Sequence, residues 1–290
     1  MIVSQEWRPE EYTTLEKVIV LIIVFKSKAR EILVKNFKLF LLPSSALMLS
    51  SVVSYLILNV FSSFLYWDYL NGILKFLCIA LLFLVEFVVV PVSTVAIFKL
   101  YAILNSFKPE NIVQQMFAFL NSSNIVKIVL INLLPNFVLL FLRINNAGLS
   151  ELNIFGLNGV ALATVIVISE FINYKVFAAN YCFALNQESA IKSLKISFNT
   201  MKGSFWKYVL VKLSFILWAI VIFFIYAIIK MTIYGFSVDV FRIYSPVLDA
   251  FRSSGFGLDL YLYPFMYLTY AVFIDGLFNT NSKTADGSLS

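Results

Sequence analysis

Two carboxylates and two amides stand inside long apolar stretches of this chain, where a polar side chain needs a reason to be. Glu86 and Glu170 are flanked on both sides by apolar residues, and a carboxylate at bilayer depth is costly. Asn132 and Asn136 are four residues apart, so they share one face of a helix. If the helices that carry them face one another, these four residues form one buried polar cluster.

Such a cluster has two interpretations. Carboxyl groups that gain and lose a proton within a membrane are typical of proton- or cation-coupled transporters. Protonated carboxyl groups that hydrogen-bond to Asn would instead hold helices together. Lys175, about one turn beyond Glu170, is a further candidate partner for that carboxylate. The sequence leaves these alternatives open.

Residues for enzymatic chemistry are scarce. The chain has no His, which is the commonest general base and metal ligand. Ser-x-x-Lys occurs at residues 189–192 and 204–207, but a lysine base must be desolvated, and both matches lie in a basic, solvent-facing stretch. We therefore expect no enzymatic activity, no catalytic residue, no cofactor and no metal site.

The overall composition indicates what kind of protein positions these side chains. Hydrophobic residues make up 61% of the 290 residues and charged residues 13%, against about 45–50% and about 25% in soluble domains. This composition predicts an all-α polytopic membrane protein, since helices satisfy their own backbone in lipid. About six transmembrane helices are expected, at residues 39–61, 73–98, 125–142, 157–179, 205–229 and 258–278.

The distribution of Lys and Arg predicts the orientation of these helices. With both termini inside, five of the 22 basic residues fall in outer segments, namely Lys75, Arg143, Lys230, Arg242 and Arg252, and all others fall in inner segments. This bias follows the positive-inside rule and predicts that both termini lie on the cytoplasmic side of the membrane, N-in and C-in. The net charge of +6 is then a topology signal, and we expect no nucleic-acid partner.

Three parts of the chain are expected from this pattern. Residues 1–38 form a cytoplasmic amphipathic and basic region, with a helix over 14–36 lying at the membrane face. Residues 39–278 form the six-helix membrane domain, and residues 279–290 a disordered cytoplasmic tail. An inner segment, residues 104–124, carries an apolar helical stripe made of Ile112, Met116, Phe119 and Leu120.

Residues 186–206, which we call the elbow, interrupt the apolar chain between the fourth and fifth spans. They predict a short interfacial helix with Asn186 as its N-cap and Gly203 as its C-cap. A helical wheel places an apolar stripe on one side, made of Ala190, Ile191, Leu194, Phe198 and Met201. Hydroxyl residues occupy the far side, at Ser189, Ser193, Ser197 and Thr200. The stripe is flanked by the basic residues Lys192, Lys195 and Lys202, which we expect to reach anionic lipid headgroups.

Three short stretches in and after the elbow form a distinctive pattern. They are Ala190-Ile191-Lys192-Ser193, then Met201-Lys202-Gly203, then Leu213-Ser214-Phe215-Ile216-Leu217-Trp218. They resemble the signature A-I-K-x-S, then M-K-G, then L-S-F-I-x-W of a bacterial family of integral membrane proteins, known as domain of unknown function 975. The elbow is also similar to the membrane domain of some glycerophosphodiester phosphodiesterases. The resemblance implies a bacterial membrane protein and adds no established activity.

The first hypothesis for function is a non-enzymatic, multi-pass protein of the bacterial cell membrane. Its role would be to organise the membrane or to serve as an accessory subunit that binds another membrane protein, with the lipid bilayer and anionic headgroups as its other partners. The alternative is a proton- or cation-coupled transporter, or a subunit of one, that uses Glu86 and Glu170.

Overall fold

The computed structural model describes residues 14–62, 72–106, 111–146, 159–215 and 256–286. Every regular element in these ranges is helical. This confirms the all-α class for the described part of the chain.

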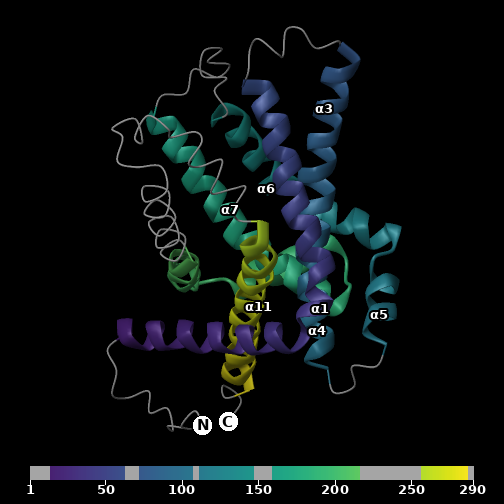
Figure 1. Cartoon of the computed structure of the whole chain (residues 1–290). Coiled ribbons are helices and arrows are strands. Elements are labelled where there is room, and N and C mark those ends of the chain that lie inside the picture. Colours follow the sequence, from purple (N-terminus) through teal and green to yellow (C-terminus); the bar gives the residue numbers. More distant parts are fainter. Residues whose placement is uncertain (1–13, 63–71, 107–110, 147–158, 216–255, 287–290) are drawn as a thin grey trace, which may run out of the picture.

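The first helix, α1 (Thr14–Ser62), has two differently directed halves. Its first half lies across one end of the molecule, and its second half stands upright beside the other long helices (Figure 1). The two halves meet at Asn36, whose backbone is not helical (φ −126°, ψ 21°). The Asn36 side chain donates to the Ile32 carbonyl at 3.0 Å, a local bond that competes with regular helix geometry. The bend lies where the sequence predicts the change from an interfacial helix to the first span.

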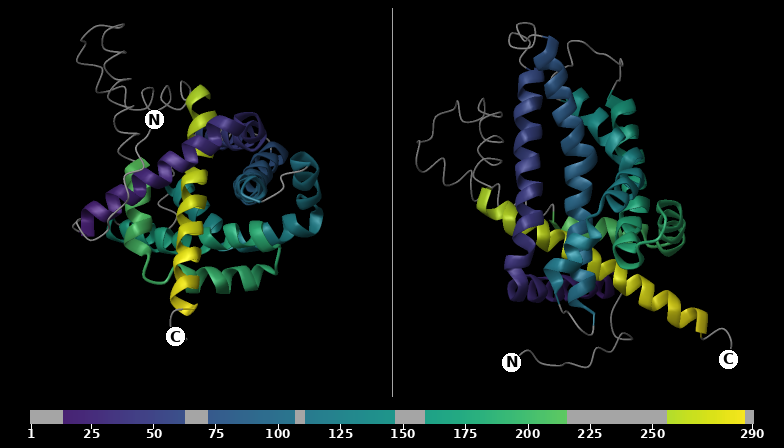
Figure 2. Two further views of the ribbon diagram at one scale, coloured as in Figure 1. Left: turned by 90° about the horizontal axis from the view of Figure 1, so that it is seen from below. Right: turned by 90° about the vertical axis from the view of Figure 1, so that its right-hand side faces the viewer.

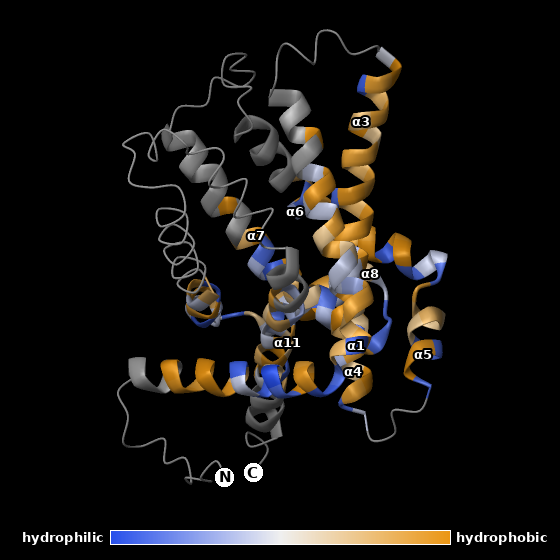
Figure 3. Ribbon diagram, viewed as in Figure 1, coloured by the Kyte–Doolittle hydropathy of each residue, from blue (hydrophilic) through white to orange (hydrophobic). Residues whose placement is uncertain are grey.

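The second long helix is built from three consecutive segments. These are α3 (Gly72–Leu84), a π-helical turn η2 (Val85–Val89) and α4 (Val90–Leu104). Together they cover the span predicted at 73–98. α3 extends to the far end of the molecule and is apolar along most of its length, whereas the horizontal half of α1 carries a hydrophilic stretch (Figure 3).

The inner segment forms a helix of its own. α5 (Ile112–Phe119) is followed by α6 (Ser122–Asn146) at a bend of 68°. Asn121 makes this corner because its Oδ1 accepts from the Asn124 backbone N–H at 2.9 Å, which is an N-cap contact. Phe119 is buried, and the rest of the predicted stripe packs against the core, so the predicted helical stripe is confirmed.

The last helices complete the bundle. α7 (Gly159–Asn186) leads into α8 (Ala190–Thr200), and a further helix occupies residues 205–215. α11 (Phe256–Asp286) crosses the horizontal half of α1 and makes its most extensive contacts with α1 (Figure 2). Because α11 continues through Asp286, the prediction of a disordered tail is wrong for residues 279–286. Residues 287–290 lie outside the described part.

Two helices in the described residues are long and apolar enough to cross a membrane, at Ile19–Ser54 and Gly72–Leu104. The bent pair Ile112–Phe119 and Ser122–Phe137 gives a third if it counts as one span, and Leu262–Phe278 is a shorter apolar helix. A membrane location is therefore plausible, with two or three candidate spans. Most of the fifth predicted span, residues 205–229, lies outside the described residues.

Candidate functional site

The π-helical turn around Glu86 follows from a proline five residues further on. Pro91 has no N–H, and in a regular α-helix its ring would collide with the carbonyl four residues earlier. The chain instead widens by one residue here, so that the Val90 N–H reaches the Val85 carbonyl. In this register the Glu86 carbonyl would need the N–H of residue 91, which proline lacks.

Asn136 of α6 supplies the missing donor. Its Nδ2 donates to the Glu86 backbone carbonyl at 2.7 Å, and Asn136 itself follows Pro135, the proline inside α6. The Asn136 amide therefore provides a donor to a carbonyl that cannot receive one from Pro91. The sequence predicts that Glu86 and Asn136 meet, but the contact is to the backbone of Glu86.

The Glu86 carboxyl group has its own partner on α1. Ser54 Oγ donates to Glu86 Oε1 at 2.8 Å, and both residues are buried, with Glu86 only 5% exposed. Ile57, Leu82 and Phe87 form a small apolar cluster beside it. π-turns often occur at functional positions, and this one places a carboxyl group where α1, η2 and α6 meet.

Asn132 lies one turn from Asn136 but belongs to a different contact. It forms a reciprocal amide pair with Asn180 of α7, in which each Nδ2 donates to the other Oδ1 at 2.8 Å. Asn132 Nδ2 also donates to the Ile128 carbonyl at 2.8 Å. Both side chains are buried, so the amide pair joins α6 to α7 away from solvent.

The predicted four-residue cluster is therefore divided in the described residues. Glu86 joins Asn136, and Asn132 joins Asn180, a partner that sequence reasoning missed. Glu170 belongs to α7, but its side chain lies outside the described residues. Its role in the cluster and its pairing with Lys175 stay predictions.

A second carboxylate, Asp275, also escaped the sequence analysis. Tyr101 of α4 and Tyr181 of α7 donate to its two oxygens, each at 3.2 Å. Asp275 therefore ties α11 to two other helices. The signal that could have found it is the one that marked Glu86, a single acidic residue in an apolar run.

The elbow helix α8 buries most of its hydroxyl side and divides its apolar stripe between the core and the surface. Ser193, Ser197 and Thr200 are buried, and Ser197 Oγ donates to the Lys175 carbonyl of α7. Ala190, Leu194 and Met201 of the stripe pack against the core, whereas Ile191 and Phe198 face outward, 79% and 50% exposed. Small hydroxyl residues let two helices approach closely, as is common within membranes.

The caps of the elbow differ in part from the prediction. Ser189 is the N-cap of α8, and its side chain accepts from the Lys192 N–H at 3.3 Å. The prediction of Asn186 as this cap is wrong because α7 continues to Asn186, and Gln187, with φ 51°, then reverses the chain. Gly203 has φ 77°, a conformation that glycine adopts readily. It lies in the turn after α8, beyond the C-cap Met201.

The lysines of the elbow divide into two kinds. Lys192 pairs with Glu188 at 2.6 Å, so its charge is compensated locally. Lys195 and Lys202 are exposed. Lys175 of α7 joins them: its Nζ lies 3.5 Å from the Phe198 carbonyl and 5.6 Å from the centroid of the Phe198 ring. Sequence reasoning placed Lys175 with Glu170 and missed this contact.

Comparison with family models, with curated proteins and with solved structures finds no match. The resemblance to domain of unknown function 975 stays a prediction. Within the described residues no group of His, Cys, Asp and Glu is arranged to hold a metal ion.

Proposed function

We propose that this chain is a multi-pass protein of the bacterial cytoplasmic membrane, with six spans and both termini inside. Its role is non-enzymatic: it organises the membrane around it or serves as an accessory subunit for a membrane-protein partner. The elbow contacts the inner leaflet and its anionic headgroups. The observation that carries this proposal is α8, which buries its serines and turns Ile191 and Phe198 outward.

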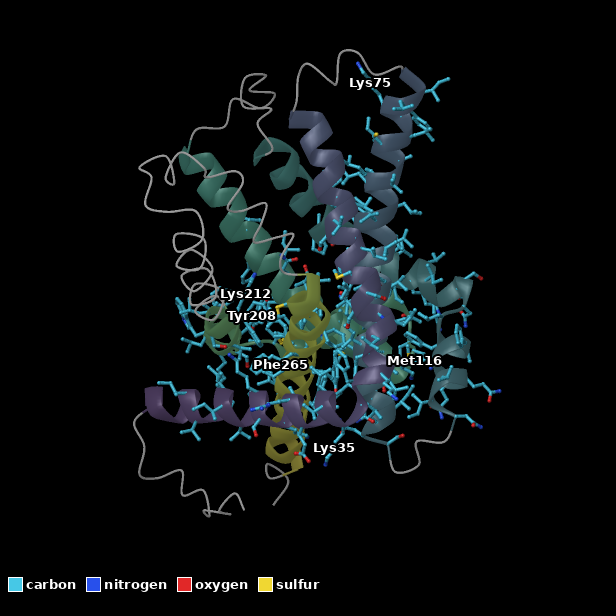
Figure 4. The ribbon with its side chains drawn as sticks, viewed as in Figure 1. Lys35, Lys75, Met116, Tyr208, Lys212 and Phe265 are labelled. Atoms are coloured by element: carbon cyan, nitrogen blue, oxygen red, sulfur yellow. The ribbon has the colours of Figure 1, made fainter. Side chains whose placement is uncertain are left out.

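The distribution of basic residues supports the orientation. Lys75 lies at the end of α3, whereas Lys35 lies on the horizontal half of α1, toward the opposite end of the molecule (Figure 4). The horizontal half of α1 exposes Ile19, Ile23 and Val24 as well as Lys28. Apolar and basic residues side by side on a surface helix favour a position in the headgroup layer.

The native Trp206 offers a direct test, because it is 73% exposed and lies at the end of the elbow, just after the turn that follows α8. In a variant with Trp206 as its single tryptophan, reconstituted in vesicles, we expect strong fluorescence quenching by lipids brominated near the headgroup. Lipids brominated deep in the chain should quench less. No quenching by either lipid would contradict the proposal.

The orientation requires a separate test. In a background that lacks Cys78 and Cys182, a Lys75→Cys variant should react with a membrane-impermeant maleimide from outside the cell. Lys35→Cys and Lys202→Cys variants should react only in inverted vesicles. Reaction of Lys75→Cys and Lys35→Cys from the same side would overturn the six-span topology.

The second candidate function is proton- or cation-coupled transport, and the buried Glu86 at a π-turn favours it. Glu170 would be the second carboxylate of that pathway. In vesicles with an imposed pH gradient, the wild type should then show a flux that Glu86→Gln abolishes, with Ser54→Ala as a milder variant. Absence of flux in the wild type excludes this candidate.

A further inference from the structure

Three lysines lie at or near the exposed Phe198 of the elbow. Lys175 of α7 contacts the Phe198 ring, with its Nζ 5.6 Å from the centroid. Lys195 is exposed on α8 three residues before Phe198, a spacing that places the two on the same side of a helix. Lys202 is exposed in the turn that directly follows α8.

These three lysines are cations without a carboxylate partner in the described part of the chain. Lys35 pairs with Glu31 and Lys192 with Glu188, and neither pair includes one of these three lysines. The Lys175 ammonium instead lies near the rings of Phe171, Tyr174 and Phe198, with centroids at 5.9, 5.1 and 5.6 Å. Aromatic rings stabilise a cation but do not neutralise it, so these ring contacts leave the charge of Lys175 in place.

The surroundings of this charge are apolar and open. Phe171, Phe198 and Ile191 are exposed large hydrophobic side chains, and Trp206 follows in the next turn. A free phosphate or another small anion would use the lysines and leave these side chains in water. An anionic phospholipid uses both, because its phosphate meets the ammonium groups while its acyl chains cover the rings.

We propose that Lys175, Lys195 and Lys202 form a binding site for the headgroup of an anionic phospholipid, with Phe198 as its apolar floor. We call these residues the headgroup site. The proposal rests on the proposed function, since it names the lipid class that the elbow selects. Lys192, although exposed, lies outside the site because Glu188 already compensates it.

The test measures phosphatidylglycerol binding to the purified chain in a neutral detergent, followed by native mass spectrometry. Each lysine near an anionic surface contributes about fivefold to binding. The triple variant Lys175→Gln, Lys195→Gln, Lys202→Gln should therefore bind phosphatidylglycerol at least tenfold more weakly than the wild type. Phosphatidylcholine should bind weakly to both proteins.

The variant Lys192→Gln is the matched control, because it removes one exposed elbow charge that is already paired. It should bind phosphatidylglycerol as the wild type does. Equal weakening in this variant, or unchanged binding in the triple variant, would overturn the proposal. Displacement of phosphatidylglycerol by glycerol 3-phosphate at similar concentration would show an anion site that needs no lipid, and would overturn it too.

Two readouts separate this proposal from the one on which it rests. If quenching of Trp206 by brominated lipid persists while lipid selectivity is absent, the headgroup site fails and the interfacial elbow stands. If the quenching itself is absent, the proposed function fails. An unchanged thermal unfolding midpoint in the triple variant will show that loss of binding does not reflect loss of fold, as expected for three side chains at the surface.

Discussion

α3 and α4 belong to one continuous helix, yet they have opposite surroundings. In α3 the only buried residue is Leu82, although nearly all of its residues are apolar. In α4 most residues are buried, and they pack against α1, α7 and α11. Both segments are strongly hydrophobic, so hydrophobicity does not distinguish the half that packs against protein from the half that is exposed.

Small and hydroxyl residues do distinguish them. The packed half contains Ser93, Thr94 and Ala96 close together, all buried, whereas the exposed half presents large side chains such as Phe76 and Leu77. Lipid is as apolar as leucine, so helices in a membrane associate through close packing and hydrogen bonds. α8 follows the same rule in part: its serines are inside with Leu194 and Met201, and Ile191 and Phe198 are outside.

The prediction with the largest expected effect on stability replaces one phenylalanine in α4 and one in α3. Phe98 of α4 is fully buried and meets the rings of Phe177, Tyr181 and Tyr267, whereas Phe76 of α3 is 70% exposed. Phe98→Ala should cost a large part of the about 3–5 kcal/mol found for buried Phe. Phe76→Ala should cost far less. Both values come from reversible unfolding in mixed micelles, and equal losses would refute the distinction between the two halves.

The second test asks whether the serine side of α8 is a packing surface. Ser197 is fully buried against α7, so a Leu there has no room. Ser197→Leu should lower the free energy of unfolding by about 1–3 kcal/mol through overpacking. The matched control is Asn199→Leu, at an exposed position two residues away, which should be neutral in detergent. A larger loss from Asn199→Leu would mean that α8 packs with its other face.

The positions of the helices along the chain follow from the sequence more closely than the rotation of each helix about its own axis. The bend at Asn36, α5 and the short elbow helix lie where patterning and turn residues place them. The cap of α8 was misplaced because Asn186 and Ser189 are both good N-caps. The choice between them depends on how far the buried end of α7, which includes Phe183, extends.

The candidate site shows the same limit. Glu86 and Asn132 were expected to be buried, and they are. Their partners, Ser54 and Asn180, could not be named because one sequence does not fix how each helix is rotated about its axis. Pro91 indicates from the sequence that residue 91 lacks an N–H. The donation from Asn136 of another helix to the Glu86 carbonyl becomes visible only in the packed structure.

A double-mutant cycle tests that replacement. Asn136→Leu removes the Asn136 donor from the Glu86 carbonyl and should cost about 1 kcal/mol in unfolding free energy. In a Pro91→Ala background the helix can regain an N–H at residue 91, so the same change should cost much less. The difference between the two backgrounds is the coupling energy. Equal costs in both would show that Asn136 stabilises the bundle for a reason unrelated to Pro91.

The smallest expected effect concerns the amide pair that joins α6 to α7. Asn132 and Asn180 are isolated from Glu86 in the described contacts, so their coupling should be that of an ordinary interhelical hydrogen bond, about 0.6 kcal/mol. The cycle uses Asn132→Ala, Asn180→Ala and the double variant, each unfolded in mixed micelles. A coupling energy of this size would mean that the amide pair determines how α6 and α7 are rotated relative to each other but contributes little to the free energy of unfolding. A coupling several times larger, or a dependence on Glu86→Gln, would mean that the amides and the buried carboxyl group act as one network after all.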